Sequence, residues 1–176
     1  MDYQALEEHI KDSVMEEQAK LGFRKEVIRL YYPVGMLNNL FGTACDAEEM
    51  QQALAGFTDF AKERLGEVTI THKKDRFCLL LPEETSIYVH EHKKENEFIH
   101  QLVKLIASLE TDMEQVKKLF EQQPFPSVVE QTTGGEFDTV IHFTQGDDRY
   151  YYCFKDEGFH ITYHRFLPAD YKDLGV

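Results

Sequence analysis

Three aromatic segments decide the fold of this chain: Thr139-Val-Ile-His-Phe-Thr144, Arg149-Tyr-Tyr-Tyr-Cys-Phe-Lys155 and Phe159-His-Ile-Thr-Tyr-His-Arg-Phe166. Aromatic and β-branched residues in short runs are typical of strands. Turn sequences separate the runs, namely Gln145-Gly-Asp-Asp148 and Asp156-Glu-Gly158. Connections this short require antiparallel neighbours, because a parallel crossover needs a dozen or more residues. We therefore predict an antiparallel meander of three or four strands over residues 127–166.

The two turns also predict the register of the meander. We expect Gly146-Asp147 and Glu157-Gly158 to be two-residue hairpin loops, so that Gln145 pairs with Asp148 and Asp156 with Phe159. Side chains alternate between the two faces along a strand, so this register gathers the large apolar residues on one face. That face is predicted to be the core, with Ile141, Phe143, Tyr150, Tyr152, Phe154, Phe159, Ile161 and Tyr163.

The opposite face of the predicted meander holds the first candidate site. In the same register His142, Tyr151 and His164 form a row across three strands. Strands lie about 4.8 Å apart, so the two histidines are roughly 10 Å apart at the backbone. That distance is wide for one metal ion but suits a small polar ligand or a proton relay. The alternative is a solvated or second-core sheet face, and a one-residue slip in either turn would dissolve the row.

The first two thirds of the chain are predicted to be mostly helical, over residues 2–122. Amphipathic spacing, capping residues and terminal glycines indicate five helices, over 2–21, 33–41, 47–65, 95–109 and 111–122. Asp46 with Glu49 and Thr111 with Glu114 have the spacing of capping boxes. A hairpin interrupts the helices near residues 67–81. The pattern leaves open whether 23–32 and 83–94 are strand or helix, and whether the hairpin joins the meander sheet.

These elements predict a single α+β domain over residues 1–176. N-terminal and central helices should pack on one face of an antiparallel sheet that includes the C-terminal meander. A chain of this length can bury roughly two thirds of its unfolded surface, so it needs no disulfide or metal for stability.

Charge and cysteine content limit the classes of function. The chain has 19 basic and 32 acidic residues, a net charge of −13, which disfavours nucleic acid and anionic membrane as partners. The three cysteines lack C-x-x-C spacing, so we expect neither a disulfide framework nor a zinc knuckle. We also see no signal peptide and no membrane-spanning segment, so the cytoplasm is the expected location.

His90-Glu-His92 is the second candidate site. In a strand both imidazoles would point the same way about 7 Å apart, a spacing that suits a metal. The alternative is a solvated turn, because charged residues surround the motif. No nucleophile, phosphate-loop or dinucleotide motif occurs, so we expect no cofactor and lean against an enzyme.

Three functions remain open from the sequence. The first is a non-catalytic interaction or accessory module with an unknown protein partner, which predicts an exposed apolar patch with aromatics such as Tyr31, Tyr32 or Phe125. The second is a small-molecule binder or enzyme that uses the face with His142, Tyr151 and His164. The third is a metal-binding protein that uses His90 and His92.

Overall fold

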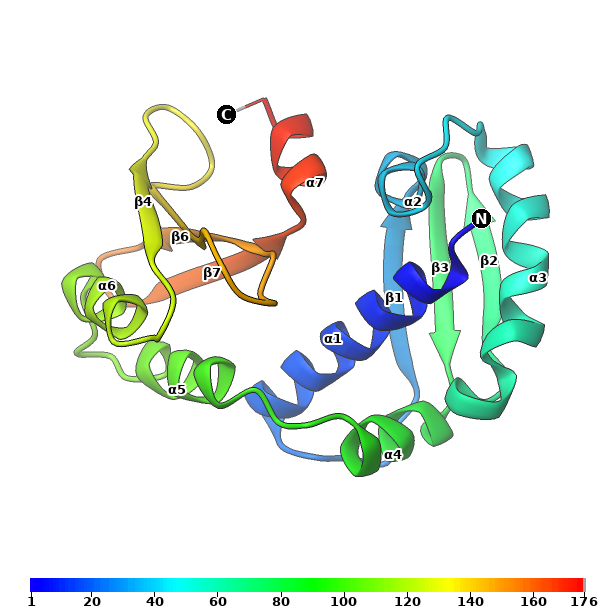
Figure 1. The fold of residues 1–176 in the computed structure, drawn as a ribbon, viewed down its shortest axis with the longest axis horizontal. Helices are drawn as coiled ribbons and strands as arrows, with labels where there is room; N and C mark the ends of the chain where they lie inside the picture. The colour runs from blue at the N-terminus through cyan, green and yellow to red at the C-terminus, as the bar shows by residue number, and fades with distance from the viewer. Residues whose placement is uncertain (176) are drawn as a thin grey trace. The chain divides into compact units, whose positions relative to one another are not determined.

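A computed structural model describes residues 1–175 of the chain as an α+β protein with seven helices and two antiparallel sheets (Figure 1). The contacts divide the chain into two compact units, Met1–Glu95 and Asn96–Val176, which we call unit 1 and unit 2. The α+β class is confirmed. The prediction of one domain over residues 1–176 stays a prediction. None of the helices in the described residues is both long enough and apolar enough to cross a bilayer.

Unit 1 is a three-stranded sheet with four helices. Its elements in chain order are α1 (Tyr3–Leu21), β1 (Ile28–Pro33), α2 (Val34–Phe41), α3 (Ala47–Leu65), β2 (Thr69–Lys73), β3 (Arg76–Leu81) and α4 (Glu83–His92). The strand order is β1-β3-β2, so the predicted hairpin pairs with β1 and not with the meander. Of the two segments left open above, residues 23–32 end in strand β1 and residues 83–94 form helix α4. The capping box of Asp46 and Glu49 is present.

The helices of unit 1 pack on one face of its sheet. Tyr32, Phe77 and Leu79 point into this core, where they meet apolar side chains of α1, α2, α3 and α4. Tyr32 is only 2% exposed, so its predicted place in an exposed patch is wrong. Figure 1 shows α1 and α3 against the sheet. Burial alternates along all three strands, which leaves the other face outward.

A buried ion cluster joins α1 to α3 inside unit 1. Glu7 is 3% exposed and accepts two hydrogen bonds from Arg64, at 2.7 and 2.8 Å. The Lys11 Nζ lies 2.5 Å from the same carboxylate. Burial alone would raise the pKa of Glu7, but the hydrogen bonds from Arg64 and Lys11 outweigh it and hold the pKa below its ordinary value. The ionised carboxylate therefore stabilises the folded unit.

Unit 2 contains the predicted meander. Its elements are α5 (Glu97–Ile106), α6 (Met113–Glu121), β4 (Ser127–Gln131), β5 (Thr139–Phe143), β6 (Tyr151–Asp156), β7 (Ile161–Phe166) and α7 (Pro168–Asp173), with strand order β4-β5-β6-β7. Edge-to-face ring contacts of Phe98 and Phe120 with Tyr152 join α5 and α6 to the sheet. The predicted cap of α6 is one residue early: Asp112 and Gln115 form the capping box, while the Thr111 hydroxyl donates to the Leu105 carbonyl.

The register predicted for the first hairpin is correct, but its two-residue turn does not form, because residues 144–150 connect β5 to β6 outside the strands. The register predicted for the second hairpin is wrong. His142 lies opposite Tyr151, as expected. Asp156, however, lies opposite Ile161, so residues 157–160 form a four-residue loop. Asp156 Oδ1 accepts a hydrogen bond of 2.8 Å from the N–H of Gly158, and this side-chain turn lengthens the loop. The register shifts by two residues, so the faces are kept but the cross-strand partners change, and Phe159 is 84% exposed instead of buried.

Candidate functional site

The structure brings together two of the three residues in the predicted histidine and tyrosine row. The rings of His142 and Tyr151 stack with centroids 4.1 Å apart and planes 2° from parallel. His164 lies opposite Cys153, because the second turn is longer than predicted. Its ring contacts Phe137, at a centroid distance of 5.8 Å. His164 is therefore not a direct cross-strand neighbour of Tyr151, and the predicted row of three residues does not form.

The face that carries His142 and Tyr151 is a small second core. Phe137, Val140, Cys153 and Tyr171 are buried there, with Tyr151 packed against them. Burial raises the pKa of the Cys153 thiol to about 12, which leaves it a poor nucleophile at neutral pH. This arrangement matches the second-core alternative. Ligand binding by His142, Tyr151 and His164 stays a prediction.

His90 and His92 lie on helix α4, not on a strand. Side chains two residues apart on a helix do not face each other, so the geometry assumed for a shared metal is wrong. His90 stacks on Phe23 at 3.9 Å, and His92 stacks on Tyr88 at 4.3 Å. Across residues 1–175 no group of three or more His, Cys, Asp or Glu residues is placed to hold a metal ion.

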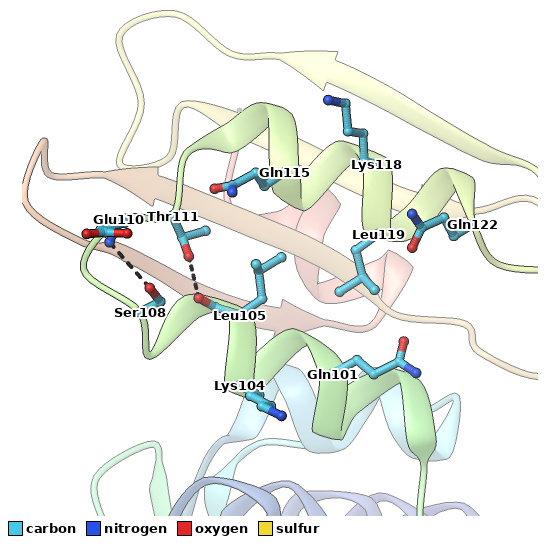
Figure 2. Close-up of a pocket in the computed structure, with 10 residues that line it drawn as sticks. All are labelled: Gln101, Lys104, Leu105, Ser108, Glu110, Thr111, Gln115, Lys118, Leu119 and Gln122. Atoms are coloured by element: carbon cyan, nitrogen blue, oxygen red, sulfur yellow. Dashed lines mark hydrogen bonds between the residues drawn. The ribbon is translucent and has the colours of Figure 1, made fainter.

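A groove of about 700 Å³ runs between α5 and α6 in unit 2 (Figure 2). Leu105 and Leu119 point into it from the two helices, and Figure 2 shows Lys104 and Lys118 pointing away from each other on opposite sides. The Gln115 amide oxygen already accepts from the N–H of Asp112. Small-molecule sites need polar groups that converge on the ligand, and the two lysines of this groove diverge.

The outward face of the unit 1 sheet has a more distinctive composition, and we call it the open face. The alternation of burial and the strand register place nine residues on it: Arg29, Tyr31, Pro33, Thr69, Thr71, Lys73, Arg76, Cys78 and Leu80. Within the described part of unit 1 the helices pack on the opposite face. The open face is hollowed toward the end that carries Lys73 and Arg76, with a volume of about 490 Å³ lined by residues that include these two, Tyr31 and Cys78. Tyr31 is 53% exposed.

The open face is basic although unit 1 is acidic. Residues 1–95 contain 18 acidic and 12 basic residues, yet the nine positions of the open face contain three cations and no carboxylate. Arg29, Lys73 and Arg76 form no ion pair with the residues that the structure describes. The positive charge of this face is therefore not neutralised by an ion pair within the described residues.

Two of the cations face each other at one end of the open face. Lys73 of β2 lies directly opposite Arg76 of β3. Like charges in this position destabilise an antiparallel pair. The Arg76 guanidinium lies over the Tyr31 ring, 5.1 Å from its centroid, in cation–π geometry. This contact limits the freedom of the guanidinium and orients it before any ligand binds.

The open face was not predicted from the sequence, although the alternation of residues in β1 is consistent with it. Residues 23–32 were compatible with strand or helix. Alternation of side chains between two faces, which places Arg29 and Tyr31 on one face, applies only if the segment is a strand. Lys73 and Arg76 looked like polar residues of a turn. Only the pairing of β1 with β3 puts Arg29, Tyr31 and Arg76 on one surface.

Comparison with known proteins identifies a family. A family model described as "Domain of unknown function, E. rectale Gene description (DUF3877)" matches residues 3–175. No curated protein and no solved structure matches the chain.

Proposed function

We propose that this chain, which belongs to the DUF3877 family, is a non-catalytic interaction module that binds an acidic segment of a protein partner through its open face. One observation carries the proposal: Arg29, Lys73 and Arg76 share the open face with the exposed Tyr31 ring, and none of the nine positions of this face is a carboxylate. A cation without a counterion at a protein surface attracts anions, and an exposed aromatic ring supplies apolar contact area.

A short acidic polypeptide segment fits this surface better than a nucleic acid does. Three cations can attract a local group of carboxylates. The net charge of −13 on the whole chain repels a long polyanion such as a phosphate backbone. A segment that touches only the open face avoids most of this repulsion. The attraction should be strongest at low salt, because exposed charges are screened by ions.

We place this activity in the cytoplasm. Cys45, Cys78 and Cys153 are all free thiols in the structure. Free thiols, Cys78 on the open face among them, persist in a reducing compartment.

The proposal is tested by fluorescence anisotropy with labelled oligoglutamate and oligoglutamine peptides on the full chain. We expect oligoglutamate to bind in a salt-dependent manner and oligoglutamine not to bind. Arg76→Glu should weaken the interaction about tenfold or more, since it replaces an attraction by a repulsion at the end of the surface that carries two cations. Arg29→Glu should weaken it as well.

Lys104→Glu is the matched control, because it makes the same charge change on α5 of unit 2, which contributes no residue to the open face. Circular dichroism melting of each variant shows whether the fold is kept. Equal binding of oligoglutamate by the wild-type chain and Arg76→Glu would refute the proposal, and so would equal losses in Arg76→Glu and Lys104→Glu.

A further inference from the structure

The three cations of the open face lie in two rows across the sheet, one near each end of the strands. Arg29 lies opposite Leu80, and Arg76 lies opposite Pro33. The two rows are four residues apart, about 13 Å at the rise of an antiparallel strand. Lys73 shares the row of Arg76, so one end holds two cations and the other end holds one.

The middle of the open face, between the two cation positions, is largely apolar. Tyr31 lies opposite Cys78, in the row halfway between Arg29 and Arg76. The half-buried side chain of Leu80 lies next to this row on the same face. The hollow of the open face lies between this row and the row of Lys73 and Arg76, and its lining includes both cations besides Tyr31, Thr71 and Cys78. An occupant therefore meets positive charge, then apolar surface, then positive charge.

An extended polypeptide has the same repeat as this surface. Its side chains i, i+2 and i+4 point to one side, and i and i+4 lie about 13 Å apart. A helix rises only about 1.5 Å per residue, so it would need eight or nine residues to span the same distance. The spacing thus favours a strand-like segment that runs parallel to the strand axes.

We infer, on the basis of the proposed function, that the partner segment is extended and has the pattern acidic–x–apolar–x–acidic. One carboxylate pairs with Arg29 and the other with Lys73 and Arg76, while the apolar side chain at the centre covers Tyr31 and Cys78. Because Arg76 is already held over the Tyr31 ring, binding orders fewer side-chain rotamers at that end. A carboxylate there also relieves the repulsion between Lys73 and Arg76.

Two capped peptides of identical composition test this pattern on the full chain. The first has the core Asp-Ser-Leu-Ser-Asp, and the second has the core Ser-Asp-Leu-Asp-Ser, in which the two carboxylates are too close together and the leucine points to the other side. We expect the first to bind about fivefold more tightly, the gain of one additional exposed ion pair. Heteronuclear NMR titration gives both affinities and shows whether the amides of β1 and β3 shift.

The preference should disappear in Arg29→Gln and in Arg76→Gln, because each removes one end of the spacing. It should remain in Lys104→Gln, which makes the same change on α5. If the two peptides bind with equal affinity, and both lose affinity in Arg76→Gln, the pattern is wrong while the proposed function stands. Tighter binding by an acidic peptide that is helical would also overturn it. If oligoglutamate fails to bind as well, the proposed function and the pattern both fall.

Discussion

Replacing Lys73 by glutamate is expected to stabilise unit 1 and to weaken its binding of acidic segments. Lys73 lies directly opposite Arg76, and both side chains are exposed. In the wild-type chain this position holds two positive charges. In Lys73→Glu it holds an opposite pair. Stability and binding should therefore change in opposite directions, which an ordinary loss-of-fold variant does not produce.

The size of the stabilisation follows from the geometry. A directly opposed pair contributes roughly 0.2–1 kcal/mol, favourable or unfavourable according to the signs of the charges. Removing a repulsion and adding an attraction gives about 1 kcal/mol in total, near the upper limit of exposed ion pairs. For a unit of this size that corresponds to a rise in melting temperature of about 4–8 °C.

The measurement is native-state hydrogen exchange of the β3 amides at low and high salt, because it reports the stability of unit 1 separately from that of unit 2. Lys74→Glu is the control. It makes the same charge change one residue away, in the turn, where the residue has φ of +56° and does not lie opposite Arg76. Salt should reduce the difference between the two variants. Equal protection in Lys73→Glu and Lys74→Glu, or lower protection in Lys73→Glu, would refute the reasoning.

Three further predictions concern stability and reactivity. Glu7→Gln should lower the free energy of unfolding at neutral pH by about 1–3 kcal/mol, measured by urea titration. Folding lowers the pKa of Glu7, so the ionised carboxylate stabilises the fold above the ordinary pKa of 4.5, and this stability is lost as the pH falls through the folded pKa. The difference in unfolding free energy between Glu7→Gln and wild type should therefore disappear in acid. Cys153 should react with a thiol reagent at pH 8 only after denaturant is added, while the other two cysteines react in the native chain; fast labelling of all three would contradict its burial. Phe154→Ala should cost about 3–5 kcal/mol and Phe159→Ala less than about 0.5 kcal/mol in the same titrations, because the first ring is fully buried and the second is 84% exposed; similar losses would contradict the four-residue loop.

The meander shows which features of a sheet can be predicted from local sequence. Gly146-Asp147 predicts the register of the first hairpin correctly, although the strands separate before this dipeptide and residues 144–150 form a longer connection. At the second turn Asp156-Glu-Gly158 fits both a tight hairpin and a longer loop. The side chain of Asp156 favours the longer loop by accepting the hydrogen bond of Gly158. That two-residue shift keeps the core face and separates His164 from the predicted row.

The candidate sites were predicted less well than the fold, for a physical reason. The proposed metal geometry at His90 and His92 assumed a strand, whereas helix α4 forms there and buries Val89 in the unit 1 core. Secondary structure in such a mixed segment depends on what packs against it. The open face depends on the pairing of β1 with β3, whose residues are more than 40 positions apart in the chain.

Local sequence accounts for five of the seven helices and the capping box of Asp46 and Glu49, and also for the α+β class, the antiparallel meander and the acidic net charge. These features depend on contacts within a few residues, or on composition alone. The tertiary structure decided which strands pair, that the hairpin near 67–81 belongs to a separate sheet with β1, and which sheet face carries no helix. Such features depend on long-range packing, so only the folded chain places Arg29, Tyr31 and Arg76 on one surface.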